Sequence, residues 1–261
     1  MRFVCCAKTS EIGLVKAAGY DLIEFSARLL SPISEAEAKE ARRQLDDIGL
    51  ACQNLNDYCG GTPAIVGPDY DGDAAVEYAK VVCERAAILG VQTIGIGAPM
   101  GRKLPAGYDP ARADDQAREF LCRTCGVASA YGIRVLWESL NDQICNYGIH
   151  LDEAIRMIQD LAIPSLGIVL DQHHMALMHE PMSFIAPGKA YIWHAHISRL
   201  ADTRRGFLVD EERAEYLAFL RTLREIGYDK NLSVEAVQGD VADEAPRSLS
   251  MLKELWAEAC A

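Results

Sequence analysis

Short apolar runs alternate with longer amphipathic stretches along the chain. Apolar runs bounded by turn residues predict buried strands, and apolar residues that recur every three to four positions predict helices. Strands are predicted at Arg2–Cys6, Leu22–Phe25, Ala51–Leu55, Thr93–Ile96, Arg134–Glu138, Gly167–Leu170, Tyr191–Ile197 and Leu232–Glu235. Helices are predicted at about 10–18, 34–48, 71–89, 110–131, 151–161, 175–186, 211–226 and 242–258.

Glycines separate several of these helices from the strands that follow, at Gly19, Gly49, Gly90, Gly132 and Gly227. Glycine is the usual helix-stop residue where the chain adopts a positive φ. Strand–helix units that follow one another without a linker predict an α/β fold, the (β/α)8 TIM barrel, as a single domain over residues 1–261. An open doubly wound sheet is the alternative, because counting units does not establish closure.

Four ligand-type side chains end four of the predicted strands in the second half of the chain. They are Glu138 in RVLWESLN, Asp171 in LGIVLDQHHM, His196 in YIWHAHIS and Glu235 in NLSVEAV. A TIM barrel places its chemistry at the carboxyl ends of its strands. Three carboxylates and one imidazole form a mostly oxygen donor set, which suits Mn²⁺, Mg²⁺ or a similar divalent ion.

Strand-end ion pairs are the alternative explanation for these carboxylates. Buried carboxylates cost several kcal/mol unless their charge is compensated. The segments VLWESLN and LSVEAV contain no basic residue, which favours a metal ion over ion pairing.

Histidines gather at two of the same strand ends. His194 and His196 point to one side of their strand because side chains alternate. His196 lies nearer the carboxyl end and is the better ligand, so His194 is expected deeper, supporting a ligand or packing in the core. His174 follows Asp171 by three residues and is expected to face a substrate.

These residues resemble the motifs of the xylose isomerase-like TIM barrels, in particular the small sugar isomerases and epimerases that include hydroxypyruvate isomerase and the ketose 3-epimerases. The resemblance runs over nearly the whole chain. The motifs are E-x-x-N at Glu138 and Asn141, D-x-x-H at Asp171 and His174, H-x-H at His194 and His196, an apolar residue before Glu235, and an Arg-x-x-Pro loop at Arg102 and Pro105.

The resemblance implies a set of roles. One divalent ion, Mn²⁺ first with Mg²⁺ or Co²⁺ as alternatives, would be held by Glu138, Asp171, His196 and Glu235. The two glutamates would also serve as catalytic acid and base. Substrate would be bound by His174, Asn141, Arg102 and an arginine after H-x-H, with Arg204 and Arg205 as the candidates. Relatives are often dimers or tetramers, so a homo-oligomer is expected.

Two positions depart from the pattern of the ketose 3-epimerases. The glutamate usual six residues after the first metal-binding glutamate is replaced by Ile144, and Glu235 is followed by AVQGD rather than a proline and an aromatic residue. A polar sugar contact is therefore missing. The departures concern the substrate rather than the fold or the metal site.

The residues support three functions. The first is a metal-dependent isomerase or epimerase that removes a proton next to the carbonyl of a sugar or keto-sugar and acts through an enediolate. The second is a lyase or dehydratase of the inosose dehydratase or C-glycoside-cleaving type that uses the same site. The third is a metal-bound binding or regulatory barrel. An endonuclease IV-like function is weaker, because it needs more metal ligands and a basic face.

Composition narrows the partners and the compartment. The chain has 26 Lys and Arg residues and 38 Asp and Glu residues. The resulting net charge of −12 disfavours binding to nucleic acid. No apolar run approaches the ~18 residues of a membrane span, so no membrane association is expected. Nine cysteines without a paired spacing indicate a reduced, cytoplasmic protein. Cys122 and Cys125 form a CxxC, but helical spacing without a second pair favours buried thiols over a zinc site.

Overall fold

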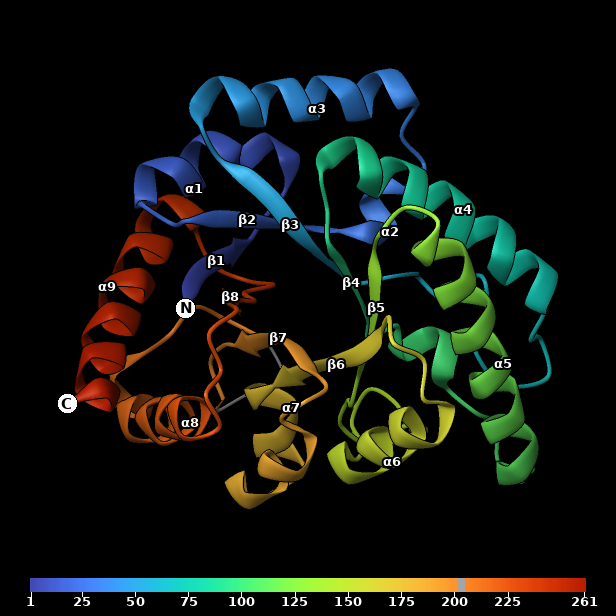
Figure 1. Cartoon of the computed structure of the whole chain (residues 1–261). Coiled ribbons are helices and arrows are strands. Elements are labelled where there is room, and N and C mark those ends of the chain that lie inside the picture. The colour runs from blue at the N-terminus through green and yellow to red at the C-terminus, as the bar shows by residue number, and fades with distance from the viewer. Residues whose placement is uncertain (201–204) are drawn as a thin grey trace.

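The strands form a closed parallel barrel in the computed structural model, which describes residues 1–200 and 205–261. Each strand pairs with its neighbours in the sequence, and β1 pairs with β8 to close the ring (Figure 1). Closure excludes the open-sheet alternative and confirms the predicted TIM barrel. The strands are β1 Arg2–Cys6, β2 Leu22–Ser26, β3 Ala51–Asn56, β4 Thr93–Ile96, β5 Arg134–Glu138, β6 Leu166–Asp171, β7 Ile192–Ile197 and β8 Asn231–Val234.

The helices lie outside the barrel and cover its strands (Figure 1). The last helix, α9, packs against both α1 and α8, so the carboxyl-terminal segment joins the two ends of the chain. The helices are α1 Ile12–Ala18, α2 Ala27–Leu30, α3 Glu35–Ile48, α4 Gly72–Leu89, α5 Pro110–Ser129, α6 Leu151–Leu161, α7 Gln172–Leu177, α8 Arg213–Glu225 and α9 Val241–Cys260.

One predicted helix is wrong and one short helix is new. Instead of a helix at 175–186, α7 ends at Leu177, and Pro181 follows with 3-10 turns at Met182–Phe184 and Ala186–Gly188. Proline disfavours helical backbone in the residue before it and ends the pattern that the apolar spacing predicts. The unexpected α2 begins at Ser26, whose side chain accepts a hydrogen bond from the Leu29 amide.

The glycine turns are confirmed. Gly19, Gly49, Gly90, Gly132 and Gly227 have φ of 88°, 64°, 81°, 69° and 74°. A side chain is strained in this left-handed region, so glycine lets each helix end and the chain turn into the next strand.

Hydrogen-bonded polar side chains cross the interior of the barrel. The amide of Asn54 donates to the Thr93 hydroxyl at 2.6 Å, and the amide of Asn231 donates to Asn54 at 2.7 Å. All three side chains are buried. Buried polar groups are tolerated when they are paired, and here they pin β3, β4 and β8 to one another.

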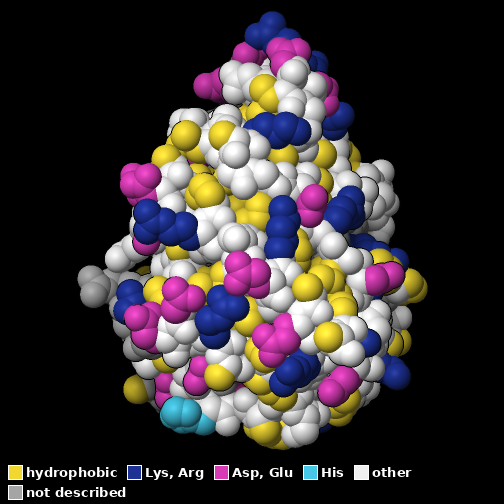
Figure 2. Space-filling model, turned by 90° about the vertical axis from the view of Figure 1, so that its left-hand side faces the viewer, with side chains coloured by type: hydrophobic (Ala, Val, Ile, Leu, Met, Phe, Trp, Pro, Cys, Tyr) yellow, Lys and Arg dark blue, Asp and Glu magenta, His cyan; other side chains and the backbone are white. Residues whose placement is uncertain are grey.

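The outer surface carries charges of both signs. On the face that Figure 2 shows, on the side of α9, basic and acidic side chains are interspersed among apolar ones. No helix among residues 1–200 and 205–261 is both long and apolar enough to cross a membrane. Cys125 is buried and Cys122 exposed, both on α5, and neither belongs to a metal-binding group among the described residues.

Candidate metal centre

Parallel strands bring the four predicted ligands to one end of the barrel. Glu138 and Asp171 are the last residues of β5 and β6, and His196 is the last but one of β7. Glu235 follows β8 directly. One donor atom from each of these four residues lies within 4.8 Å of the other three. The strand-end argument from the sequence therefore places all four side chains in a single cluster.

The donor atoms converge on the Nδ1 atom of His196. It lies 3.5 Å from Glu138 Oε1, 3.6 Å from Asp171 Oδ2 and 3.2 Å from Glu235 Oε2. None of these four buried atoms has a hydrogen bond, although Arg205 forms ion pairs with Asp171 Oδ2 and Glu235 Oε2. Buried polar atoms are rarely left without one, so their common direction needs a separate explanation.

In Glu235, Asp171 and His196, the polar atom that points away from the cluster contacts a neighbouring residue. The Asn56 amide donates to Glu235 Oε1 at 2.7 Å, and the His174 backbone amide donates to Asp171 Oδ1 at 3.1 Å. His196 Nε2 lies 3.3 Å from Glu24 Oε1. One side of each group is thus fixed and the other left open, as expected for ligands oriented by their surroundings. Three oxygens and one nitrogen fit a Mn²⁺- or Mg²⁺-type ion.

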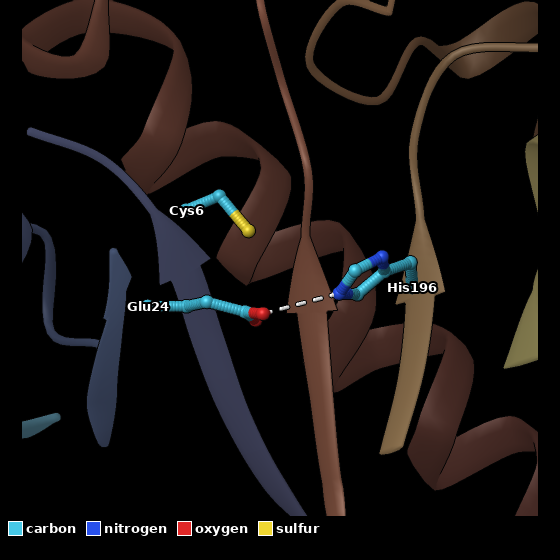
Figure 3. Close-up of side chains that lie close together, drawn as sticks. All are labelled: Cys6, Glu24 and His196. Carbon is cyan, nitrogen blue, oxygen red and sulfur yellow. Dashed lines mark hydrogen bonds and ion pairs between the residues drawn. The ribbon is translucent and has the colours of Figure 1, made fainter. Parts of the chain in front are cut away.

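Glu24 supports His196 from inside the barrel, and sequence reasoning missed it. It lies on β2 across from His196 on β7 (Figure 3). Its other oxygen is 2.8 Å from His194 Nε2 and also accepts from the Ser233 hydroxyl. Burial alone would raise the pKa of Glu24, but His194 and His196 hold it well below the usual value. The expectation that His194 lies deeper than His196 as a supporting residue agrees with this contact.

Cys6 lies beside Glu24 and His196, and these three residues form a second group of metal-ligand type (Figure 3). Both Glu24 oxygens are already in contact with His194, His196 or Ser233. Burial, followed by the charge of Glu24, raises the pKa of the Cys6 thiol well above its usual value. A protonated thiol is a poor ligand, so this group serves to orient His196 rather than to bind a second ion.

A basic residue does reach the carboxylates, although none is near them in the sequence. Arg205 lies in ion-pair contact with Glu235, 2.6 Å from Asp171 Oδ2 and 3.9 Å from Glu138 Oε1. Burial would raise the pKa of Asp171, but Arg205 keeps it well below the usual value. Once His196 has given up its proton to act as a ligand, three carboxylates and one guanidinium leave a charge of −3 + 1 = −2, which a divalent ion would balance. The other candidate, Arg204, lies outside the described residues.

His174 faces the same cavity and is oriented by Asn141. Asn141 Oδ1 accepts from the Gln143 amide, so its NH₂ group points to His174 Nδ1, 2.7 Å away. Burial, with Arg205 next, lowers the pKa of His174 well below the usual value. The ring is therefore neutral, and its two nitrogens contact Asn141 and Arg205. Asn141 is buried behind His174 and reaches the cavity through it.

Arg102 does not line the main cavity. Its side chain is fully buried, lies 4.2 Å over the Trp137 ring and donates to the backbone carbonyl of Glu138 at 2.9 Å. Burial lowers the pKa of its guanidinium. The structure thus places Arg102 behind Glu138, where it positions that residue, rather than beside a substrate.

A cavity of about 420 Å³ opens above the cluster at the carboxyl ends of the strands. Glu138, Glu235, His174 and Arg205 line its floor. Both acidic and basic side chains line it. Its position agrees with the end of the barrel at which this fold carries its sites.

Gly97, directly after β4, is a further residue that the sequence did not single out. A Cβ atom there would lie 2.5 Å from Glu138 Oε2. Glu138 can therefore keep its place only beside a residue without a side chain. The signal in the sequence, GIGAPMG, is a glycine-rich loop whose purpose only the spatial neighbour reveals.

Gly97→Ala is expected to push the Glu138 carboxylate off its position and to weaken Mn²⁺ binding by about tenfold or more, the scale of disturbed ligand support. Titration calorimetry of the metal-free protein measures this. Gly126→Ala on α5 is the matched control, because a Cβ there meets nothing within 4 Å. Equal Mn²⁺ affinity of the two variants would contradict the role given to Gly97.

The chain is similar in sequence and in fold to known proteins. A ketose 3-epimerase from Arthrobacter globiformis is 27% identical over 257 residues, covering 93% of this chain and 82% of that protein. An L-ribulose 3-epimerase from Mesorhizobium japonicum is 24% identical over 258 residues, covering 93% and 80%. A solved structure of an L-ribulose 3-epimerase superimposes with a TM-score of 0.83 at 19% identity, over 99% of this chain and 95% of that one.

The sequence profile of the xylose isomerase-like TIM barrels matches residues 12–255, which is most of the chain. The match includes β2 to β8 and all four residues of the cluster. Together with the closed barrel, it establishes that this chain belongs to the xylose isomerase-like TIM barrel family.

Proposed function

We propose that the protein is a divalent-metal-dependent sugar isomerase or epimerase of the ketose 3-epimerase type, which removes a proton next to the carbonyl of a keto-sugar. The observation that carries the proposal is the pair of glutamates, Glu138 and Glu235, whose clustered oxygens lie within 4.8 Å of one another. They come from β5 and from the end of β8, so a substrate between them meets a carboxylate on either side.

Glu138, Asp171, His196 and Glu235 would hold the ion, with Mn²⁺ the first candidate. When bound, a divalent ion supplies Lewis-acid polarisation of the carbonyl oxygen, which acidifies the adjacent C–H. One glutamate accepts that proton, and the C–H electron pair becomes the C=C bond of an enediolate. The other glutamate, which must enter this step protonated, gives its proton to the opposite face of the carbon, which inverts the centre and re-forms the carbonyl.

His174 and Arg205 are placed to hold a substrate oxygen. His174 Nε2 and Arg205 Nη2 are in hydrogen-bond contact at 2.5 Å, and both residues line the cavity. The guanidinium of Arg205 has donors only, so a substrate oxygen beside it can accept from it. A hydroxyl or enediolate oxygen of the substrate is such an acceptor, and this orients the sugar over the two glutamates.

Solvent isotope exchange tests the proposal. Mn²⁺-loaded protein in D₂O is incubated with D-fructose, D-tagatose and L-ribulose, and deuterium at the carbon next to the carbonyl is followed by NMR. Deuterium in the ketose and its epimer is the expected result. Products of water elimination would favour the lyase alternative, and absence of exchange with all three ketoses would count against the proposal.

Acidification is expected to weaken metal binding and activity together. Burial would lower the pKa of His196, but Glu24 and the neighbouring carboxylates raise it well above the usual value. The metal-free site therefore keeps a proton on His196 at neutral pH, and an ion must displace it. Below the raised pKa, affinity should fall about tenfold per pH unit, with about one proton released per ion.

Calorimetry in two buffers of different ionisation enthalpy counts that proton directly. An activity profile that stays flat down to about pH 4, below the ordinary pKa of histidine, would contradict the expectation. The homo-oligomeric state and the cytoplasmic location stay predictions from the sequence.

A further inference from the structure

Three large apolar side chains are exposed to solvent at the mouth of the cavity. Leu29 is 49% exposed, Ile144 36% and Val237 74%. They come from α2, the loop after β5 and the loop after β8, and all three line the cavity above the cluster. We call these three residues the collar. Only eight large apolar side chains in the described part of the chain are this exposed, so their meeting at one opening is notable.

The collar is continuous with the site below it. Leu140 and Phe207, both buried, line the cavity between the glutamates and the mouth. Ile144 and Val237 also line a second, smaller cavity together with His174 and Arg205. The two collar residues therefore flank the groups that orient a substrate oxygen. A ligand that starts at the glutamates and extends outward along this wall meets apolar surface.

Charged residues occupy a different part of the mouth. Lys8 and Glu11 line it from the segment after β1, Arg28 from α2 and Asp57 from the position after β3. Arg28 and Asp57 pair with one another at 3.0 Å. The mouth is thus polar around Leu29, which follows Arg28 on α2, and apolar at Ile144 and Val237.

Size and solvation identify what the collar would bind. The cavity of about 420 Å³ falls within the roughly 300–1,000 Å³ of sites that hold drug-sized ligands. A small ketose at the floor would leave the collar in water. The side chains of Leu29, Ile144 and Val237 offer no hydrogen bond to a hydroxyl, whereas an apolar group against them would be favoured.

We infer that the substrate is a keto-sugar that carries an apolar substituent of several carbons at the end remote from its carbonyl, and that the collar of Leu29, Ile144 and Val237 holds this substituent. The inference rests on the proposed function for the position of the carbonyl end. It adds a recognition element for the other end of the molecule.

Matched pairs of ligands test the collar. Binding of D-fructose and 6-O-butyl-D-fructose, and of D-tagatose and its 6-O-butyl ether, is measured by calorimetry on the Mn²⁺-loaded protein. The butyl ether of at least one pair should bind at least about tenfold more tightly than its parent, a difference of about 1.4 kcal/mol. Equal affinity within both pairs, or no detectable binding of any of the four, would overturn the inference.

Variants test whether the collar is the source of the higher affinity for the butyl ethers. Ile144→Ser and Val237→Ser should each reduce the ratio of butyl-ether to parent affinity, whereas Val81→Ser should leave it unchanged. Val81 is 37% exposed on α4 and outside the cavity, so it is the matched control for Val237. An equal loss of the ratio in the control would remove the collar from the explanation.

Two further outcomes separate this inference from its alternatives. If no pair shows a gain and Val237→Ser turns a dimer into a monomer in sedimentation, the collar is covered by a second copy and the inference fails. If deuterium enters the parent ketoses but no butyl ether binds more tightly, the inference fails alone. If a collar-dependent gain appears without any isotope exchange, the proposed function fails and the apolar subsite stands.

Discussion

Glu138→Gln and Glu235→Gln are each expected to lower kcat by about 10²–10⁴-fold, the usual cost of losing a general acid or base. Glutamine keeps the shape of the side chain and one ligating oxygen, so metal and substrate can still bind. It cannot accept the substrate proton. The loss should therefore appear in kcat more than in KM, as for an interaction that is made in the transition state.

The two variants should differ in isotope exchange. Each should stop exchange of the one epimer whose proton its glutamate removes and retain exchange of the other. A lyase needs only one base, so one variant would then be nearly inactive and the other only weakened. Glu153→Gln on α6, an exposed glutamate, is the control for the amide substitution itself. Full activity in both active-site variants would refute proton transfer by these residues.

The strand pattern of the sequence was sufficient for the barrel and for the four clustered side chains. Parallel strands all end at one rim, so residues such as Asp171 and Glu235, at the ends of separate apolar runs, must meet once the ring closes. The predicted helix at 175–186 failed for a local reason. Apolar spacing continues through Pro181, but the backbone geometry of proline does not allow the helix to continue.

Residues that act through a neighbour were harder to predict. Glu24 is one polar residue inside the apolar run LIEFS, and Asn56 lies at the end of β3 without any motif around it. Their partners, His196 and Glu235, are more than a hundred residues away in the chain. A buried carboxylate in the middle of a strand is costly unless it is paired, and that cost was the available signal.

The compensation of the carboxylates' charge by a basic residue was also missed, because that residue is distant from them in the sequence. The lack of a basic residue near Glu138 and Glu235 in the sequence favoured a metal ion over an ion pair, yet Arg205 reaches both from the loop between β7 and β8. Two other features of the site favour a metal ion. Four donor atoms converge without hydrogen bonds, and one guanidinium leaves two of the three negative charges uncompensated.

Removal of a metal ligand is expected to lower Mn²⁺ affinity more than removal of the residue that supports the ligand. His196→Ala removes a ligand and should weaken Mn²⁺ binding strongly, and Asp171→Asn should weaken it less, because its amide keeps one oxygen. Glu24→Gln leaves all four ligands in place but loses the carboxylate that fixes the His196 ring. A change of this kind typically costs about 10–100-fold in metal affinity. Calorimetry and elemental analysis measure both effects.

A double-mutant cycle decides whether Glu24 acts through His196. Residues that act as one unit are not additive, so Glu24→Gln should have little further effect on Mn²⁺ affinity in the His196→Ala background. Thermal unfolding of the metal-free variants separates this coupling from a general loss of stability, since Glu24 also contacts His194 and Ser233 inside the barrel. A full 10–100-fold loss in both backgrounds would mean that Glu24 affects the centre independently of His196, through the barrel as a whole.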